Sequence, residues 1–143
     1  MSETRDLIDM HYAAFNERDF SKTSQIYSPD VVTIEPGSER MEGPDAVVAH
    51  AQAFLTGFPD ARLEVLTVVD DGVRVAIEGL FVGTNTGSLQ TPNGELAPTG
   101  RPLRLPFSDI WESEAGRITR HQVYYDQMTF LGQLGLIPQP AGT

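Results

Sequence analysis

The spacing of apolar residues predicts three helices in the first sixty residues. From Glu3 to about Glu17, side chains at three- and four-residue intervals share one helical face: Leu7, Ile8, His11, Tyr12 and Phe15. Asp19 is expected to cap a second, short helix that carries Phe20, Ser24 and Tyr27. A third helix begins after Gly43, with Pro44 at its first position, and ends at Phe58-Pro59-Asp60. Its apolar face comprises Val47, Val48, Ala51, Phe54 and Leu55.

Most of the remaining chain has the pattern of strands. Residues 31–34 are a β-branched run, and two longer runs, 62–69 and 73–82, are joined by Asp70-Asp71-Gly72, a strong hairpin signal. A second hairpin is predicted from 103–113 and 118–125, turning at Glu114-Ala115-Gly116-Arg117. Between the hairpins, polar residues rich in Gly and Pro at 84–101 predict a long loop. A short helix, 127–134, is expected to stop at Gly135.

This order of elements predicts an α+β fold in one domain, 1–143, with a loose tail at 138–143. The N-terminal helices are expected to pack on one face of a curved antiparallel sheet. Such a sheet, closed on one side by helices, forms a cone with an open mouth. That shape suits a pocket for a hydrophobic small molecule.

The composition of the chain excludes several classes of function. Net charge is −10 without a basic patch, so we expect no nucleic-acid partner. The chain has no Cys, which excludes a disulfide, a thiol nucleophile and a Cys-ligated zinc. The first residues are too polar for a signal peptide, and no apolar run approaches the roughly 18 residues that span a bilayer. We therefore expect a cytoplasmic protein without a membrane partner.

The predicted second hairpin supplies the candidate pocket lining. Its pairing places Asp109 opposite Gln122, Phe107 opposite Tyr124 and Trp111 opposite Arg120, unless a bulge shifts the register. Because side chains alternate between faces, one face is expected to carry Phe107, Asp109, Trp111, Arg120, Gln122, Tyr124 and Asp126. The other face is expected to carry Ser108, Ile110, Glu112, Thr119, His121, Val123 and Tyr125.

Several short motifs resemble the SnoaL-like polyketide cyclases of the nuclear-transport-factor-2-like superfamily. The C-terminal motifs are Gly83-Thr84-Asn85-Thr86-Gly87, Pro98-Thr99-Gly100-Arg101, Asp126 and Gln133-Leu134-Gly135. Looser matches occur at residues 12–16, Asp19, 27–30, 42–44 and 58–60, so the resemblance covers nearly the whole chain. It implies the α+β barrel of that superfamily and a homodimer formed through the exposed sheet face. The superfamily also contains isomerases, epoxide hydrolases and binding proteins, so the fold alone does not fix the function.

The resemblance implies that Asp126 is the general acid/base, which removes a proton next to a carbonyl and later returns one. A carboxylate in an apolar enclosure suits this task because desolvation raises its pKa toward the working pH. The alternative is a structural role, since Asp at a helix start accepts hydrogen bonds from free backbone N–H groups.

Asp109 is a second candidate catalytic residue. It could share a proton with Asp126 or orient a water molecule, and two Asp with Arg120 would also suit an epoxide-opening site. The alternative for Asp109 is a salt bridge to Arg120 or Arg104.

Eight further residues are candidate substrate contacts, each with an ordinary structural role as the alternative. They are Tyr12, Phe15, Phe54, Asn85, Phe107, Trp111, Gln122 and Tyr124. Asn85 is placed near the pocket mouth by the resemblance alone. Relatives often have His at that position, and Trp or an acidic pair where this chain has Arg120-His121-Gln122. These departures point to a substrate different from that of the aromatic polyketide cyclases.

No metal or cofactor is expected. His11, His50 and His121 have no partners at metal-ligand spacing, and His50 is not expected to face the cavity. The chain contains neither a Gly-x-Ser-x-Gly elbow nor a glycine-rich phosphate loop. Three hypotheses remain: a cofactor-independent cyclase or isomerase of a polyketide-like carbonyl compound, an epoxide hydrolase using Asp109 and Asp126, or a non-catalytic binding domain.

Overall fold

The computed structural model describes residues 2–38, 40–91 and 94–138, so the predicted tail lies, apart from Pro138, outside the described residues. The helices are α1 (Glu3–Glu17), α2 (Thr23–Ile26), α3 (Pro44–Gly57) and α4 (Gln127–Gln133). The strands are β1 (Tyr27–Ile34), β2 (Met41–Glu42), β3 (Arg62–Asp70), β4 (Arg74–Thr84), β5 (Leu89–Thr91), β6 (Gly94–Leu96), β7 (Pro102–Glu114) and β8 (Arg117–Tyr124).

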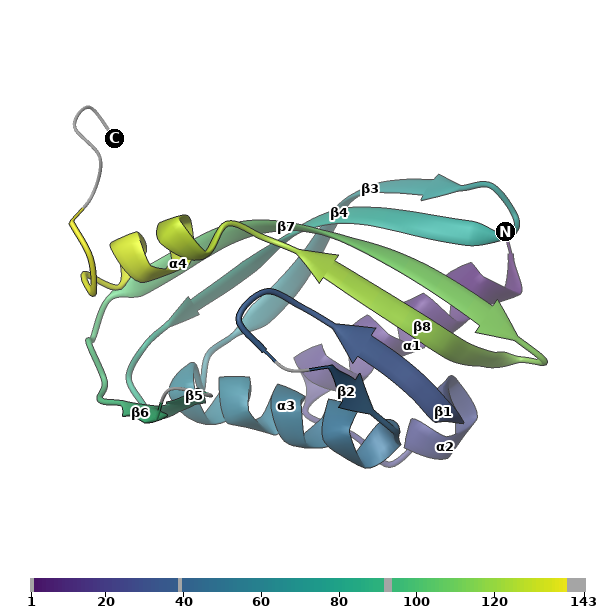
Figure 1. The fold of residues 1–143 in the computed structure, drawn as a ribbon, viewed down its shortest axis with the longest axis horizontal. Coiled ribbons are helices and arrows are strands. Elements are labelled where there is room, and N and C mark those ends of the chain that lie inside the picture. Colours follow the sequence, from purple (N-terminus) through teal and green to yellow (C-terminus); the bar gives the residue numbers. More distant parts are fainter. Residues whose placement is uncertain (1, 39, 92–93, 139–143) are drawn as a thin grey trace.

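Six strands form one sheet in the order β2-β1-β8-β7-β4-β3. Its pairs are antiparallel except β1 with β8, which run parallel. Figure 1 shows this curved sheet arching over α1, α2 and α3, with α4 at one end. The predicted α+β fold, a curved sheet closed by the N-terminal helices, is confirmed.

The helices follow their sequence signals closely, with one exception. In α1, Ser2 accepts a hydrogen bond from the Arg5 N–H, and the predicted face of Leu7, Ile8, Tyr12 and Phe15 is buried. The short helix α2 begins at Thr23 without a side-chain cap, because the Asp19 carboxylate instead accepts from the Ser21 N–H. Within the described part of the chain, no helix is long and apolar enough to cross a membrane.

The predicted loop at 84–101 contains structure of its own. Its central residues form the small hairpin β5–β6, and Leu89 is buried against α3. A Cβ at Gly57 would lie 3.0 Å from a methyl group of Leu89, so the small residue at the end of α3 allows this close packing.

The register of the β7–β8 hairpin differs from the prediction. Near the turn it agrees, with Glu114 opposite Arg117 and Ser113 opposite Ile118. An irregularity then shifts the pairing by one residue, so that Glu112 faces Arg120, Trp111 faces His121 and Asp109 faces Val123. Because side chains alternate, this shift moves every later residue of β8 to the other face. The prediction that Arg120, Gln122 and Tyr124 share a face with Asp109 is therefore wrong.

The pairing of β3 with β4 is also irregular. The β3–β4 register shifts between Val65 and Thr67, opposite Gly79. A Cβ on Gly79 would lie 2.6 Å from the ring of Phe107, closer than real atoms approach. Glycine thus lets the Phe107 ring lie across β4, where it reaches the interior of the cone.

Candidate functional site

A cavity of about 130 Å³ lies between the inner face of the sheet and the helices α1 and α3. Its surface is mostly apolar, and aromatic rings supply much of it. The lining residues are His11, Tyr12, Phe15, Phe20, Tyr27, Thr33, Glu35, Met41, Val47, Val48, His50, Ala51, Phe54, Leu63, Phe81, Leu105, Phe107, Asp109, His121, Val123 and Tyr125. Titratable side chains in such a setting are the natural candidates for chemistry.

Asp109 is the centre of a buried hydrogen-bond network. Its side chain is 3% exposed, and its two oxygens accept bonds from three neighbours. The Tyr12 hydroxyl donates at 2.8 Å, the Trp111 Nε1–H at 2.9 Å, and Nε2 of His121 lies 2.9 Å from Oδ2. The predicted salt bridge to Arg120 or Arg104 is absent from these contacts. Both carboxylate oxygens are engaged, so Asp109 holds its neighbours in place rather than facing the cavity with a free oxygen.

His121 is the residue that Asp109 orients. Its ring stacks on Trp111 with a centroid separation of 3.5 Å and an interplanar angle of 12°. Since Asp109 accepts at Nε2, the neutral ring carries its proton there and leaves a lone pair on Nδ1. No hydrogen bond among the described residues occupies Nδ1, and the residue lines the cavity. A carboxylate, an imidazole and a free basic nitrogen are the arrangement of a general base with its positioning residue.

Thr33 lies beside His121, because the two are paired on the adjacent parallel strands β1 and β8. Thr33 is 4% exposed and lines the cavity. Its Oγ1 is the single fully buried side-chain polar atom without a hydrogen-bond partner among the described residues. An unpaired buried hydroxyl is unfavourable, and such a group often has a partner in a bound water or ligand.

His11 packs against the same network from α1. Its Nδ1 is hydrogen-bonded to the Tyr27 hydroxyl, and its ring lies 5.4 Å from that of His121. Burial, and then the neighbouring His121, hold the pKa of His11 well below its ordinary value, so His11 is neutral. Burial likewise raises the pKa of the hydroxyls of Tyr12 and Tyr27, which stay protonated as hydrogen-bond donors.

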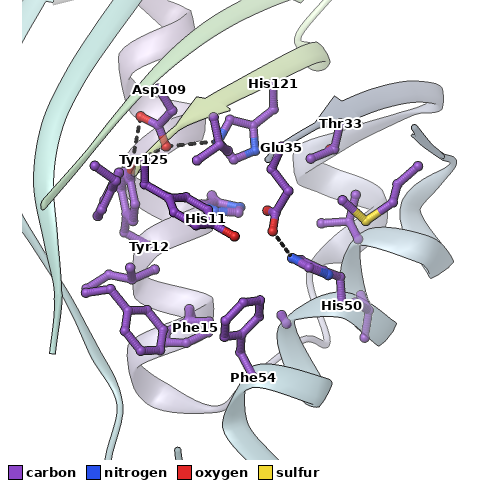
Figure 2. Close-up of a pocket in the computed structure, with 18 of the residues that line it drawn as sticks. His11, Tyr12, Phe15, Thr33, Glu35, His50, Phe54, Asp109, His121 and Tyr125 are labelled. Atoms are coloured by element: carbon purple, nitrogen blue, oxygen red, sulfur yellow. Dashed lines mark hydrogen bonds and ion pairs between the residues drawn. The ribbon is translucent and has the colours of Figure 1, made fainter. Parts of the chain in front are cut away.

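A second polar pair lies elsewhere on the cavity wall. Glu35 follows β1, and its Oε1 is 2.7 Å from Nε2 of His50 on α3. Figure 2 shows Asp109 and His121 on one side of the cavity and the Glu35–His50 pair facing it from another. The expectation that His50 does not face the cavity is wrong.

The structure brings together part of the predicted site. Tyr12, Phe15, Phe54, Phe107 and Asp109 all line the cavity. Trp111 is fully buried behind Asp109 and is absent from the lining. Whether the lining residues bind substrate stays a prediction.

Three further predicted contacts, besides Trp111, are absent from the cavity lining. Gln122 and Tyr124 are on the outer face of the sheet because of the register shift, and Tyr124 is 55% exposed. Asn85 is buried, but its amide holds the backbone: it donates to the carbonyls of Gly57 and Gly87 and accepts from Thr99. Asn85 therefore joins α3 to the loop before β7 and does not form a pocket mouth.

Asp126 is an exposed helix cap. Its carboxylate accepts from the Met128 N–H at 2.9 Å and from the Thr129 hydroxyl at 2.9 Å, at the start of α4. It is absent from the cavity lining, so Asp109 and Asp126 do not face one cavity. Arg120 is also outside, 3.7 Å from Glu112. The geometry required for epoxide opening by two Asp and an Arg is not formed.

Sequence reasoning missed His121, His11, Thr33, Glu35 and His50 as cavity residues. The periodicity of α1 already placed His11 on the buried face, and His50 lies one turn before Phe54 on α3. His121 faces the cavity because the β7–β8 register is irregular, and no sequence pattern predicted that irregularity. Among the described residues, no group of three or more metal-binding side chains could hold an ion.

The curved sheet closed by helices around a mostly apolar cavity is an α+β fold with the shape of a small-molecule pocket. A model of the SnoaL-like polyketide cyclase family matches residues 5–134, and the chain belongs to this family. A search of curated proteins found no match. Family membership supports a cyclase function in general.

Solved structures show the same fold. IdmH from Streptomyces antibioticus, a candidate polyketide cyclase, is 28% identical, with a TM-score of 0.75 over 92% of this chain and 98% of its own. AclR from Streptomyces galilaeus, a candidate hydroxylase, is 24% identical with a TM-score of 0.80, covering 98% of this chain and 85% of its own. A candidate SnoaL-like polyketide cyclase from Jannaschia sp. CCS1 is 14% identical with a TM-score of 0.81, covering 95% and 94%. The last two likenesses concern the fold alone.

Proposed function

We propose that this protein is a cyclase or isomerase of a hydrophobic, polyketide-like carbonyl compound, with His121 as its acid/base. The observation that carries the proposal is the Asp109–His121 pair in the wall of an apolar cavity, with Nδ1 of His121 unoccupied. This revises the role first expected for Asp126, whose carboxylate is engaged at the start of α4.

The proposed reaction uses only groups of the protein and the substrate. Nδ1 of His121 takes a proton from the carbon next to a carbonyl, and the C–H electron pair becomes an enolate. The enolate carbon then forms a C–C bond with a second carbonyl of the same molecule. The resulting alkoxide takes the proton back from His121, so the product is an isomer of the substrate.

Each neighbour has a part in this scheme. Asp109 is a positioning residue that stabilises the imidazolium formed when His121 accepts the proton. We assign the Thr33 hydroxyl as the donor to the enolate oxygen, because it adjoins His121 and has no hydrogen-bond partner among the described residues. The apolar walls, including Phe15, Phe54 and Phe107, bind the carbon skeleton and exclude water.

The first step can be tested without the natural substrate. 2-Tetralone is a small hydrophobic ketone with exchangeable α-protons, and its deuterium exchange in D₂O is followed by proton NMR. We expect the protein to accelerate exchange, with saturation as the ketone fills the cavity, and His121→Gln to abolish the acceleration. Wild-type exchange at the rate of buffer alone, under conditions where binding is demonstrated, would contradict the proposal.

The homodimer and the cytoplasmic location stay predictions. Exposed apolar side chains on the outer face of the sheet, Val69 at 61% and Tyr124 at 55%, support the dimer. Sedimentation analysis of wild type against Tyr124→Lys tests it, because a charge at a dimer interface would favour the monomer.

A further inference from the structure

The Glu35–His50 pair is a second polar site within the cavity. Its two side chains come from different elements, Glu35 from the segment after β1 and His50 from α3. The Glu35 side chain is 10% exposed and that of His50 is 25% exposed, so the pair is less deeply buried than Asp109 and His121. The proton-transfer scheme above uses neither residue.

A stabilising role does not account for this pair. Replacing a buried ionic pair by apolar residues is often neutral or stabilising, because the charges lose hydration on burial. The pair lines a cavity whose surface is mostly apolar, and the His50 ring contacts Phe54 edge-on at 5.0 Å. A carboxylate kept in such a wall indicates that a ligand group meets it.

The hydrogen-bonding capacity of the pair defines the ligand group. Oε1 of Glu35 is engaged by His50, whereas no hydrogen bond among the described residues uses Oε2. Oε2 is therefore able to accept from a ligand donor, and its charge disfavours a ligand carboxylate. A ketone or an ether oxygen has no hydrogen to donate. A hydroxyl group fits, and it does not carry the desolvation cost of an ammonium group in an apolar cavity.

Tyr125 supplies the complementary donor beside this carboxylate. Burial, and then the charge of nearby Glu35, raise the pKa of Tyr125, so its hydroxyl stays protonated. That hydroxyl donates to the Pro36 carbonyl at 3.2 Å, a long bond that a ligand oxygen can replace. The cavity thus offers an acceptor and a donor at the same place, as a bound hydroxyl requires.

We infer that Glu35 and His50 form a specificity subsite for a hydroxyl group of the substrate. Resting on the function proposed above, this makes the substrate a hydrophobic compound with two oxygen functions. Its reacting carbonyl lies at His121, and a neutral phenolic or enolic hydroxyl lies at Glu35. The apolar skeleton between them packs on the aromatic walls.

Binding of four naphthalenes that differ in one substituent tests this inference by calorimetry at pH 7. We expect 2-naphthol to bind about tenfold more tightly than 2-methoxynaphthalene, since only the naphthol can donate to Glu35. 2-Naphthoate is expected to bind more weakly than either. Equal affinity of naphthol and its methyl ether, tightest binding of the naphthoate or of 2-(aminomethyl)naphthalene, or no naphthol binding at millimolar concentration would overturn the inference.

Glu35→Gln is the direct variant, with Asp126→Asn as the matched control for loss of a carboxylate outside the cavity. We expect the naphthol preference to fall to about twofold or less in Glu35→Gln and to persist in the control. A tenfold preference that survives in a folded Glu35→Gln protein would contradict the inference. If Glu35→Gln fails to fold, the comparison of 2-naphthol with 2-methoxynaphthalene on the wild type still tests the inference.

The same probes separate this inference from the proposed function. His121→Gln is expected to lose proton exchange yet keep the naphthol preference. If the wild type prefers the hydroxyl compound but does not exchange α-protons, the subsite is supported and the cyclase mechanism is ruled out. If the wild type exchanges α-protons but shows no hydroxyl preference, the mechanism is supported and the subsite is ruled out.

Discussion

Asp109 lines the cavity and Asp126 lies outside it at the start of α4, and the two show how burial separates the roles of chemically identical side chains. Asp109 is buried with Tyr12, Trp111 and His121, and two of these partners, Tyr12 and His121, line the cavity. Asp126 is exposed and accepts hydrogen bonds from the first turn of α4. A carboxylate that orients an imidazole inside an apolar cavity can contribute to catalysis, whereas one that caps a helix contributes to stability. Substitutions inside and outside the cavity test this division.

The largest effect is expected for His121→Gln. Glutamine can still donate to Asp109 but has no basic nitrogen, so acceleration of 2-tetralone exchange should fall by about 10²–10⁴-fold. NMR exchange rates at saturating ketone measure this loss, and circular dichroism confirms the fold. A folded variant that retains most of the acceleration would place the base elsewhere.

Asp109→Asn should lower the same rate by about 100-fold, because His121 loses the carboxylate that fixes its tautomer. Removing an acceptor from three buried donors should also cost about 1–3 kcal/mol of unfolding free energy. Nitrogen-15 NMR of the His121 ring distinguishes positioning from simple damage. The wild type should show the proton on Nε2, and the variant should show a mixture of tautomers.

His11 should make stability depend on pH. Its folded pKa is lowered by burial, so below about pH 6.5 the unfolded chain binds a proton that the folded chain does not. Stability from this group is therefore complete above pH 6.5 and declines as the pH falls. Between pH 7.5 and 5.5 the wild type should therefore lose more unfolding free energy than His11→Gln in urea unfolding. Equal losses would contradict the neutral, buried state of His11.

Thr33→Val should lower the exchange rate without lowering the stability of the fold. The variant keeps the shape of the side chain but removes the unpaired hydroxyl, so the unfolding free energy should stay the same or rise. If Thr33 donates to the enolate, the exchange rate should fall about tenfold. An unchanged rate would exclude Thr33 from that role.

The smallest effect on rate is expected for Asp126→Asn, at the start of α4 and outside the cavity. Asparagine also caps helices, so we expect a loss of at most about 1 kcal/mol in unfolding free energy and a rate within about twofold of wild type. Asp126→Ala should cost about 1 kcal/mol and again leave the rate nearly unchanged. Urea unfolding and the exchange assay measure both.

The sequence was sufficient to predict the fold, because local patterns determined it. The buried face of α1, the start of α3 at Pro44 and the turn at Ala115-Gly116 all follow from residue spacing and turn chemistry. The cavity aromatics Phe15, Phe54 and Phe107 could be predicted for the same reason. These features depend on residues close together in the chain.

The site could be predicted only in part, because it depends on one irregularity. The shift between Glu112 and Ser113 exchanges the faces of β8, bringing His121 inside and sending Gln122 and Tyr124 outside. Strand alternation before the shift gave the correct partners, so the error begins at the bulge. The Glu35–His50 contact joins a loop to a helix, and no local spacing predicts such a pair.

The most direct test of the central claim compares His121→Gln and Asp126→Asn in one exchange experiment. Both proteins are purified in parallel, and α-proton exchange of 2-tetralone is followed by NMR at the same saturation. We predict that Asp126→Asn exchanges within about twofold of wild type while His121→Gln falls by about 100-fold or more. A folded His121→Gln protein with near-wild-type exchange beside an inactive Asp126→Asn protein would contradict it.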